Sequence, residues 1–122
     1  FSSFQARLWD DECGCYRDGE GSSHATVQGN AMALACGAVP PDRIASVADY
    51  VEKKGFSCST YMAQFVLDSL FLAGRDRAAI ALMTSDAHRS WLGMMAKGAT
   101  ITPEFWDLTM SESGRIPDMN HA

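Results

Sequence analysis

The pattern of apolar and polar positions divides the chain into helices of two kinds. From residue 42 to 54, apolar residues recur every three or four positions and charged residues occupy the other faces. This pattern predicts an amphipathic helix that is half-exposed to water. The segments 22–38 and 59–74 are instead apolar or small on nearly every face, which is typical of helices covered on several sides. The chain is therefore predicted to be all-α, with inner and outer helices alternating.

Shorter elements complete this expected organisation. Residues 4–9 are predicted to form the last turns of a helix. Two further helices are expected at 76–84 and 85–97. Residues 10–21 are rich in glycine and aspartate, which predicts a turn or short hairpin. Residues 100–102 are expected to be briefly extended before a loop.

Capping residues place the ends of the main helices. Ser22 or Ser23 is the expected N-cap of the first inner helix, and Ser85 or Asp86 that of the last helix. Gly55 follows two lysines and is a natural stop for the amphipathic helix.

The alternation of helix types favours one architecture over a plain bundle. In a two-layered helical toroid, the inner ring is covered on both sides and the outer ring faces water. A bundle would make most of its helices amphipathic. No fixed-period repeat of a solenoid type is visible. We therefore expect about five helices in antiparallel hairpins that form part of such a toroid.

Composition narrows the classes of partner and cofactor. The 122 residues carry a formal net charge of −5 and no basic stripe, which argues against a nucleic-acid or membrane-surface partner. No apolar run approaches the roughly 20 residues of a membrane-spanning helix. The four cysteines lack the spacing of a zinc site. We expect no metal or cofactor, reduced cysteines with a structural role, and Cys36 as a small buried hydrophobe.

Several short motifs, taken in their order along the chain, resemble one enzyme family. They are Trp9-Asp10, Gly14, Tyr16-Arg17-Asp18-Gly19, His24, Asn30-Ala31-Met32-Ala33-Leu34-Ala35, Ser90-Trp91-Leu92, Gly98-Ala99-Thr100, Glu104, Trp106-Asp107 and Asn120-His121. In this order and spacing the chain resembles the later part of bacterial α-L-rhamnosidases, of the glycoside hydrolase family 78 group. The resemblance spans nearly the whole chain. It departs from the family at two positions: members commonly carry an aromatic residue where Pro103 stands and a basic residue where Phe105 stands.

The resemblance implies an (α/α)6 barrel, with residues 1–122 forming a partial catalytic domain truncated at both ends. The family removes terminal α-L-rhamnose with inversion, which requires one carboxylic acid to protonate the leaving oxygen and one carboxylate to activate water. Glu104 matches the family's water-activating base. Its alternative role is to favour the dipole of a helix that begins at Pro103. The family's general acid lies on an earlier segment, and nothing in this chain matches it.

Five further residues are candidates for substrate binding. His121 matches a histidine that lines the sugar pocket in the family. Trp106 is expected either to stack on the sugar or to pack in the core, and Asp107 either to orient a hydroxyl or to cap a turn. His24 faces the barrel axis or is a satisfied core histidine. Tyr61 faces the cavity or is structural.

The leading hypothesis is that the chain is part of an α-L-rhamnosidase-like enzyme whose substrate is a rhamnoside carbohydrate. The alternatives are another (α/α)6 glycosidase, or a non-catalytic helical module that binds an oligosaccharide or a partner. The chain alone is expected to be inactive. It is also expected to self-associate, because inner helices outside a complete ring expose apolar faces. The resemblance leaves open whether the parent protein is cytoplasmic or periplasmic.

Overall fold

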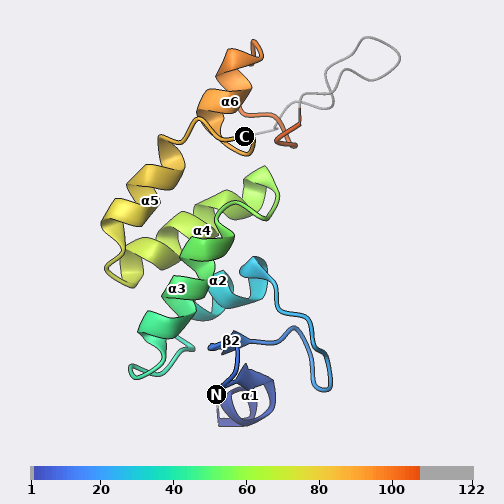
Figure 1. Ribbon diagram of the computed structural model, residues 1–122, viewed down its shortest axis with the longest axis vertical. Helices are drawn as coiled ribbons and strands as arrows, with labels where there is room; N and C mark the ends of the chain where they lie inside the picture. Colours follow the sequence, from blue (N-terminus) through green and yellow to red (C-terminus); the bar gives the residue numbers. More distant parts are fainter. Residues whose placement is uncertain (1, 108–122) are drawn as a thin grey trace.

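The computed structural model describes residues 2–107, which form a mainly helical structure with a short hairpin near its N-terminal end (Figure 1). The elements are α1 (Ser2–Leu8), β1 (Trp9–Asp10), β2 (Cys15–Tyr16), α2 (Val27–Ala35), α3 (Ile44–Lys54), α4 (Thr60–Leu72), α5 (Asp76–Met83) and α6 (Trp91–Ala96). The predicted all-α class is confirmed. Six helices are found in the described part of the chain, where about five were expected.

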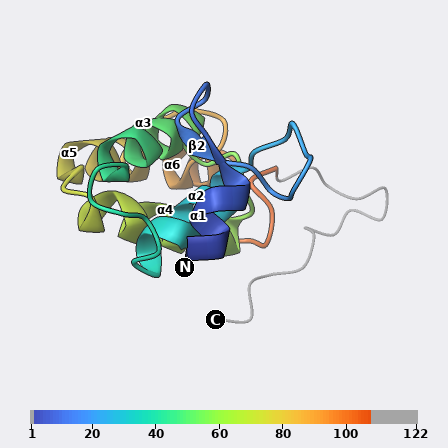
Figure 2. The same cartoon turned by 90° about the horizontal axis from the view of Figure 1, so that it is seen from below.

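The core lies where the middle helices meet. Helix α2 packs most extensively against α4 and then against α3. Fully buried side chains from all three helices join there, among them Ala31, Val47, Val66 and Leu70. In Figure 1, α1 and α6 lie at opposite ends of this central group. Seen end-on in Figure 2, the loop before α2 projects away from the helices.

Helix α3 has the two-sided character predicted from its sequence. Val47, Ala48 and Val51 are completely buried, whereas Asp49 and Glu52 are exposed. The apolar residues recur at helical spacing, so one face packs on the core while the other meets water. The helix ends at the predicted glycine, whose φ of 52° lies in the left-handed region that favours this residue.

Helix α4 departs in part from its predicted character. It was expected to be covered on several sides, but the described residues cover only one. Val66 and Leu70 are fully buried against the core, whereas Phe65 is 37%, Phe71 41% and Leu72 70% exposed. The physical reason is that its buried residues, among them Ala63, Val66 and Leu70, share one face of the helix, and the helices that contact it are α2, α3 and α5. A large apolar face of this helix is therefore left open.

The first inner helix begins later than predicted. Its N-cap is Thr26, whose hydroxyl oxygen accepts a hydrogen bond from the Gly29 N–H at 3.2 Å. Asp18 explains the shift, because its Oδ1 accepts hydrogen bonds from the Thr26 N–H at 2.9 Å and the Thr26 hydroxyl at 2.8 Å. These contacts hold the backbone extended up to Thr26, so neither Ser22 nor Ser23 caps the helix.

The last helix also starts later, at Trp91. Its N-cap is Ser90, whose Oγ accepts a hydrogen bond from the Gly93 N–H at 2.9 Å. The Ser85 Oγ instead accepts one from the Ala87 N–H at 3.0 Å and closes a local turn. The predicted cap at Ser85 or Asp86 is therefore wrong.

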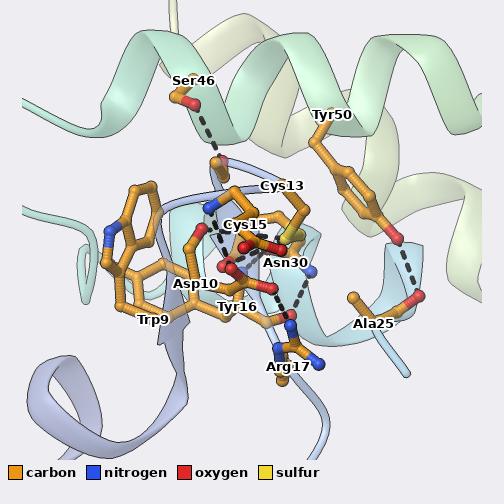
Figure 3. Close-up of a disulfide and its surroundings, with 12 residues drawn as sticks. Trp9, Asp10, Cys13, Cys15, Tyr16, Arg17, Ala25, Asn30, Ser46 and Tyr50 are labelled. Atoms are coloured by element: carbon orange, nitrogen blue, oxygen red, sulfur yellow. Dashed lines mark hydrogen bonds and ion pairs between the residues drawn. A yellow bond between two sulfur atoms is a disulfide. The ribbon is translucent and has the colours of Figure 1, made fainter. Parts of the chain in front are cut away.

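The glycine-rich segment forms the predicted hairpin, in which β1 and β2 pair antiparallel with Trp9 opposite Tyr16. At its tip Cys13 and Cys15 form a disulfide, with their Cα atoms 5.3 Å apart (Figure 3). The expectation that these cysteines are reduced is wrong, because the turn brings the two side chains together. Cys36 is exposed, not buried, since it follows α2 as its C-cap.

None of the helices in the described range is both long and apolar enough to cross a membrane.

Candidate active site

The segment after α6 folds back onto the start of α4 and is fastened there by buried polar contacts. The Thr60 hydroxyl lies within hydrogen-bonding distance of the carbonyl oxygens of Pro103, at 3.0 Å, and Glu104, at 2.7 Å. The Trp106 indole N–H donates a hydrogen bond to the Cys58 carbonyl at 2.7 Å. The backbone that carries Glu104 is therefore fixed on both sides of that residue.

The Glu104 carboxylate is oriented by a tyrosine from the first turn of α4. The Tyr61 hydroxyl donates a hydrogen bond to Glu104 Oε1 at 2.9 Å. This bond, with partial burial and the negative charge of Glu104, raises the pKa of Tyr61. The phenol thus keeps its proton and remains a donor. Residues 104–106 form bends, so the alternative in which Glu104 lies in a first helical turn is not realised.

Glu104 is half-buried and faces a cavity of about 430 Å³. The cavity is lined by Cys58, Ser59, Arg89, Glu104, Phe105, Trp106 and Asp107. Arg89 and Phe105 of this lining were not among the residues predicted to bind substrate. Arg89 brings a positive charge and five N–H donors, and Phe105 brings an aromatic ring that is 56% exposed. In the sequence, Arg89 directly precedes the Ser90-Trp91-Leu92 motif and Phe105 directly follows Glu104. These positions next to family motifs were the signals that could have identified them.

Trp106 belongs to an aromatic cluster beneath this cavity. It is only 5% exposed, and its ring is stacked on Phe56 with centroids 5.2 Å apart. Trp91 approaches it edge-on at 5.4 Å. Of the two roles expected for Trp106, these surroundings support packing rather than stacking on a sugar.

Asp107 is engaged by two neighbouring side chains, His88 and Lys97. Its Oδ1 lies 2.9 Å from His88 Nε2 and 3.8 Å from Lys97 Nζ, and all three side chains are largely exposed. These contacts connect the site segment to α6 and to the loop before it. In this arrangement Asp107 acts as a tether for the segment.

Of the two histidine candidates, His24 lies in the described residues, and its hydrogen-bonded partner there is Asp18 rather than Glu104. His24 is exposed, and its Nδ1 lies 2.6 Å from Asp18 Oδ2 in the loop before α2. That loop lies far from α6 along the molecule (Figure 1). The core-histidine alternative for His24 is wrong, because α2 begins only at Val27. His121 lies outside the described residues.

Metal-ligating side chains do not cluster in the described part of the chain. No group of three or more histidine, cysteine, aspartate or glutamate residues there is placed to hold an ion.

The cavity offers one carboxylate, Glu104, that is oriented by the phenol of Tyr61. It also contains the guanidinium group of Arg89 and the exposed aromatic ring of Phe105.

Comparison with known proteins identifies the family. The chain matches the profile of the bacterial alpha-L-rhamnosidase 6 hairpin glycosidase domain over residues 2–122. Comparisons with curated proteins and with solved structures returned no significant match. The profile match covers nearly the entire chain and agrees with its helical architecture. The chain therefore belongs to the bacterial α-L-rhamnosidase six-hairpin glycosidase family and is part of that helical domain.

Proposed function

We propose that this chain supplies the general base, Glu104, of an inverting hydrolase that acts on terminal α-L-rhamnosides. One observation carries the proposal. Glu104 is fixed through its backbone by Thr60 and through its carboxylate by Tyr61, and it faces a cavity. A general base must be held within reach of a water molecule, and this double attachment provides such positioning.

The contacts of Glu104 suit the removal of a proton from water. Among residues 2–107, the hydrogen-bonded partner of the carboxylate is Tyr61, which binds Oε1. The second oxygen, Oε2, is thereby left to accept a hydrogen bond from the attacking water. An inverting enzyme places the acid roughly 6.5–9.5 Å from the base so that this water fits between them.

The proton donor must come from elsewhere. Asp107 also lines the cavity, but it is engaged by His88 and Lys97. We propose that the general acid and the remaining helices of the ring belong to protein outside these 122 residues. One carboxylate cannot serve both halves of an inverting displacement.

Substrate contacts follow from the same cavity. We propose that Arg89 donates hydrogen bonds to sugar hydroxyls and that the exposed ring of Phe105 packs on an apolar face of the sugar. Tyr61 contributes through its hold on Glu104. His121 remains a predicted pocket residue, and Trp106 supports the site from below.

The decisive experiment uses a complete catalytic domain that contains these residues. In Glu104→Gln, release of an aryl α-L-rhamnoside is expected to fall by roughly 10²–10⁴-fold in kcat, because an amide cannot take a proton from water. The matched control is Glu52→Gln, which alters an exposed carboxylate on α3 and should keep full activity.

A rescue experiment separates a base from an acid or a merely structural residue. Azide needs no deprotonation, so it should restore turnover to Glu104→Ala and form the β-configured rhamnosyl azide. Full activity of Glu104→Gln would contradict the proposal. Sugar binding that is saturable and survives this substitution, in a complete domain without turnover, would instead indicate a carbohydrate-binding module.

The isolated chain provides a separate prediction. It should release no measurable product from an aryl α-L-rhamnoside, because the proposed proton donor is supplied by another part of the enzyme. A sensitive chromogenic assay at high protein concentration checks this. Turnover by the 122 residues that disappears in Glu104→Gln would show that the chain contains its own acid.

A further inference from the structure

The disulfide at the tip of the β1–β2 hairpin joins two cysteines in different surroundings (Figure 3). Cys13 is exposed, whereas Cys15 is completely buried. The bond can therefore be approached from solvent at one sulfur only. The other sulfur stays inside the protein, beside α2 and α3.

The hairpin does not depend on this bond for its position. Asn30 of α2 holds β2 on both sides of Tyr16, accepting from its N–H at 2.7 Å and donating to its carbonyl at 2.9 Å. Ser46 of α3 donates to the Gly14 carbonyl at 2.8 Å. The disulfide closes a loop of only three residues, which restricts the unfolded chain little. A role as a structural clamp is therefore poorly supported.

Gly14 keeps the two cysteines adjacent whatever their redox state. Its φ is 62°, and a Cβ at this position would lie 2.2 Å from Ser46 Oγ. Only glycine combines this left-handed conformation with so close an approach to α3. The turn is thus held by backbone geometry and by α3, so reduced cysteines would remain side by side.

A shallow cavity lies over the disulfide and carries charges of both signs. Both cysteines line it, together with Asp10, Glu12, Arg17, Ser23, His24, Ala25, Tyr50 and Lys54. Arg17 is paired with Asp10, and Lys54 lies over the Tyr50 ring at 5.5 Å. A small peptide thiol that carries both carboxylates and an ammonium group complements such a surface.

We propose that Cys13–Cys15 is a site of reversible thiol–disulfide exchange with small peptide thiols of the glutathione type. A thiolate attacks Cys13 Sγ, so that a new S–S bond forms while the Cys13–Cys15 bond breaks and its electron pair leaves on Cys15 Sγ. A second thiolate attacks the ligand sulfur, releasing the oxidised thiol dimer and leaving Cys13 as a thiolate. The two protons of the reacting thiols complete the protein dithiol.

The test measures this equilibrium in the folded chain. Cys36→Ser removes the exposed free thiol, and the remaining free cysteine, Cys58, is buried, which raises its pKa to about 11 and slows its reaction. This chain is equilibrated with graded ratios of reduced and oxidised glutathione, quenched with acid, alkylated and mapped by mass spectrometry. As the ratio of reduced to oxidised glutathione rises, Cys13 and Cys15 should change from the disulfide to the dithiol form. The helical circular dichroism signal should stay unchanged.

Two single substitutions test the direction of attack. Cys15→Ser should retain one glutathione on Cys13 as a stable mixed disulfide when treated with oxidised glutathione. Cys13→Ser should react at Cys15 at least about tenfold more slowly, since exchange depends on access to the sulfur. Equal rates for the two variants would overturn the assignment of Cys13 as the attacked sulfur.

Three other results would overturn the proposal as a whole. The first is a pair that stays oxidised in reduced glutathione until denaturant is added. The second is a loss of helix on reduction, which would identify a structural clamp. The third is a pair that remains a dithiol in oxidised glutathione. None of these results depends on glycosidase activity, so failure here leaves the role of Glu104 untouched.

Discussion

At the scale of single residues, the contact between Tyr61 and Glu104 connects positions that are 43 residues apart. Both residues were candidates from the sequence, but their pairing was not predicted. The sequence suggested a cavity-facing tyrosine and a base with aromatic neighbours. The structure shows that Tyr61 holds the carboxylate of Glu104, which gives Tyr61 a positioning role toward the proposed base.

This contact predicts a change in the ionisation of Tyr61. The hydrogen bond to Glu104 and its negative charge raise the pKa of the phenol, so Glu104→Gln should lower the pKa of Tyr61 toward its ordinary value. Ultraviolet titration of tyrosinate in the two chains measures the shift, and Tyr61→Phe identifies which of the three tyrosines is responsible. An unchanged titration would show that the contact does not form in solution.

At the scale of elements, helix types were more predictable than helix starts. The amphipathic period of α3 placed its buried face correctly, because that period is a local property of the sequence. The starts of α2 and α6 were misplaced toward the N-terminus. Several serines upstream offered suitable oxygens, and the choice among them was made by the contacts of Asp18 and by the local turn at Ser85.

The N-cap of α2 offers a test at this scale. Thr26→Ala removes the hydroxyl that accepts from the Gly29 N–H and donates to Asp18. The chain should lose about 1 kcal/mol of unfolding free energy, the usual effect of removing a threonine cap. Urea unfolding followed by circular dichroism measures the loss. Thr100→Ala, at an exposed position outside the helices, is the control, and an equal effect there would argue against the cap.

At the scale of the whole molecule, the open side of the helices is the main feature. Helix α4 exposes Phe65, Phe71 and Leu72, and α5 exposes Ile80 at 53% and Met83 at 45%. Soluble monomers rarely leave contiguous apolar surface of this kind uncovered. In the family's six-hairpin domain, helices of this type lie within a ring, which accounts for their apolar character.

We predict that the isolated chain self-associates through this open side. Sedimentation velocity over a range of concentrations should show species larger than the monomer. Leu72→Glu should shift the distribution toward monomer, because it places a charge in the contact. Glu52→Lys on the exposed face of α3 is the matched control and should have no effect. A monomer at every concentration would refute the prediction.

The helical class, the outer character of α3, the hairpin near the N-terminus and the family could all be predicted from the amino-acid sequence. These depend on local periodicity, on turn-forming residues and on short motifs in a fixed order, all of which can be read without knowing which segments meet. Three other features became visible only in the folded chain: Tyr61 binds Glu104, Trp106 lies under the cavity, and Cys13 and Cys15 are joined. The reason is physical: each of these outcomes depends on side chains brought together by packing or by a turn, and their energies depend on that proximity.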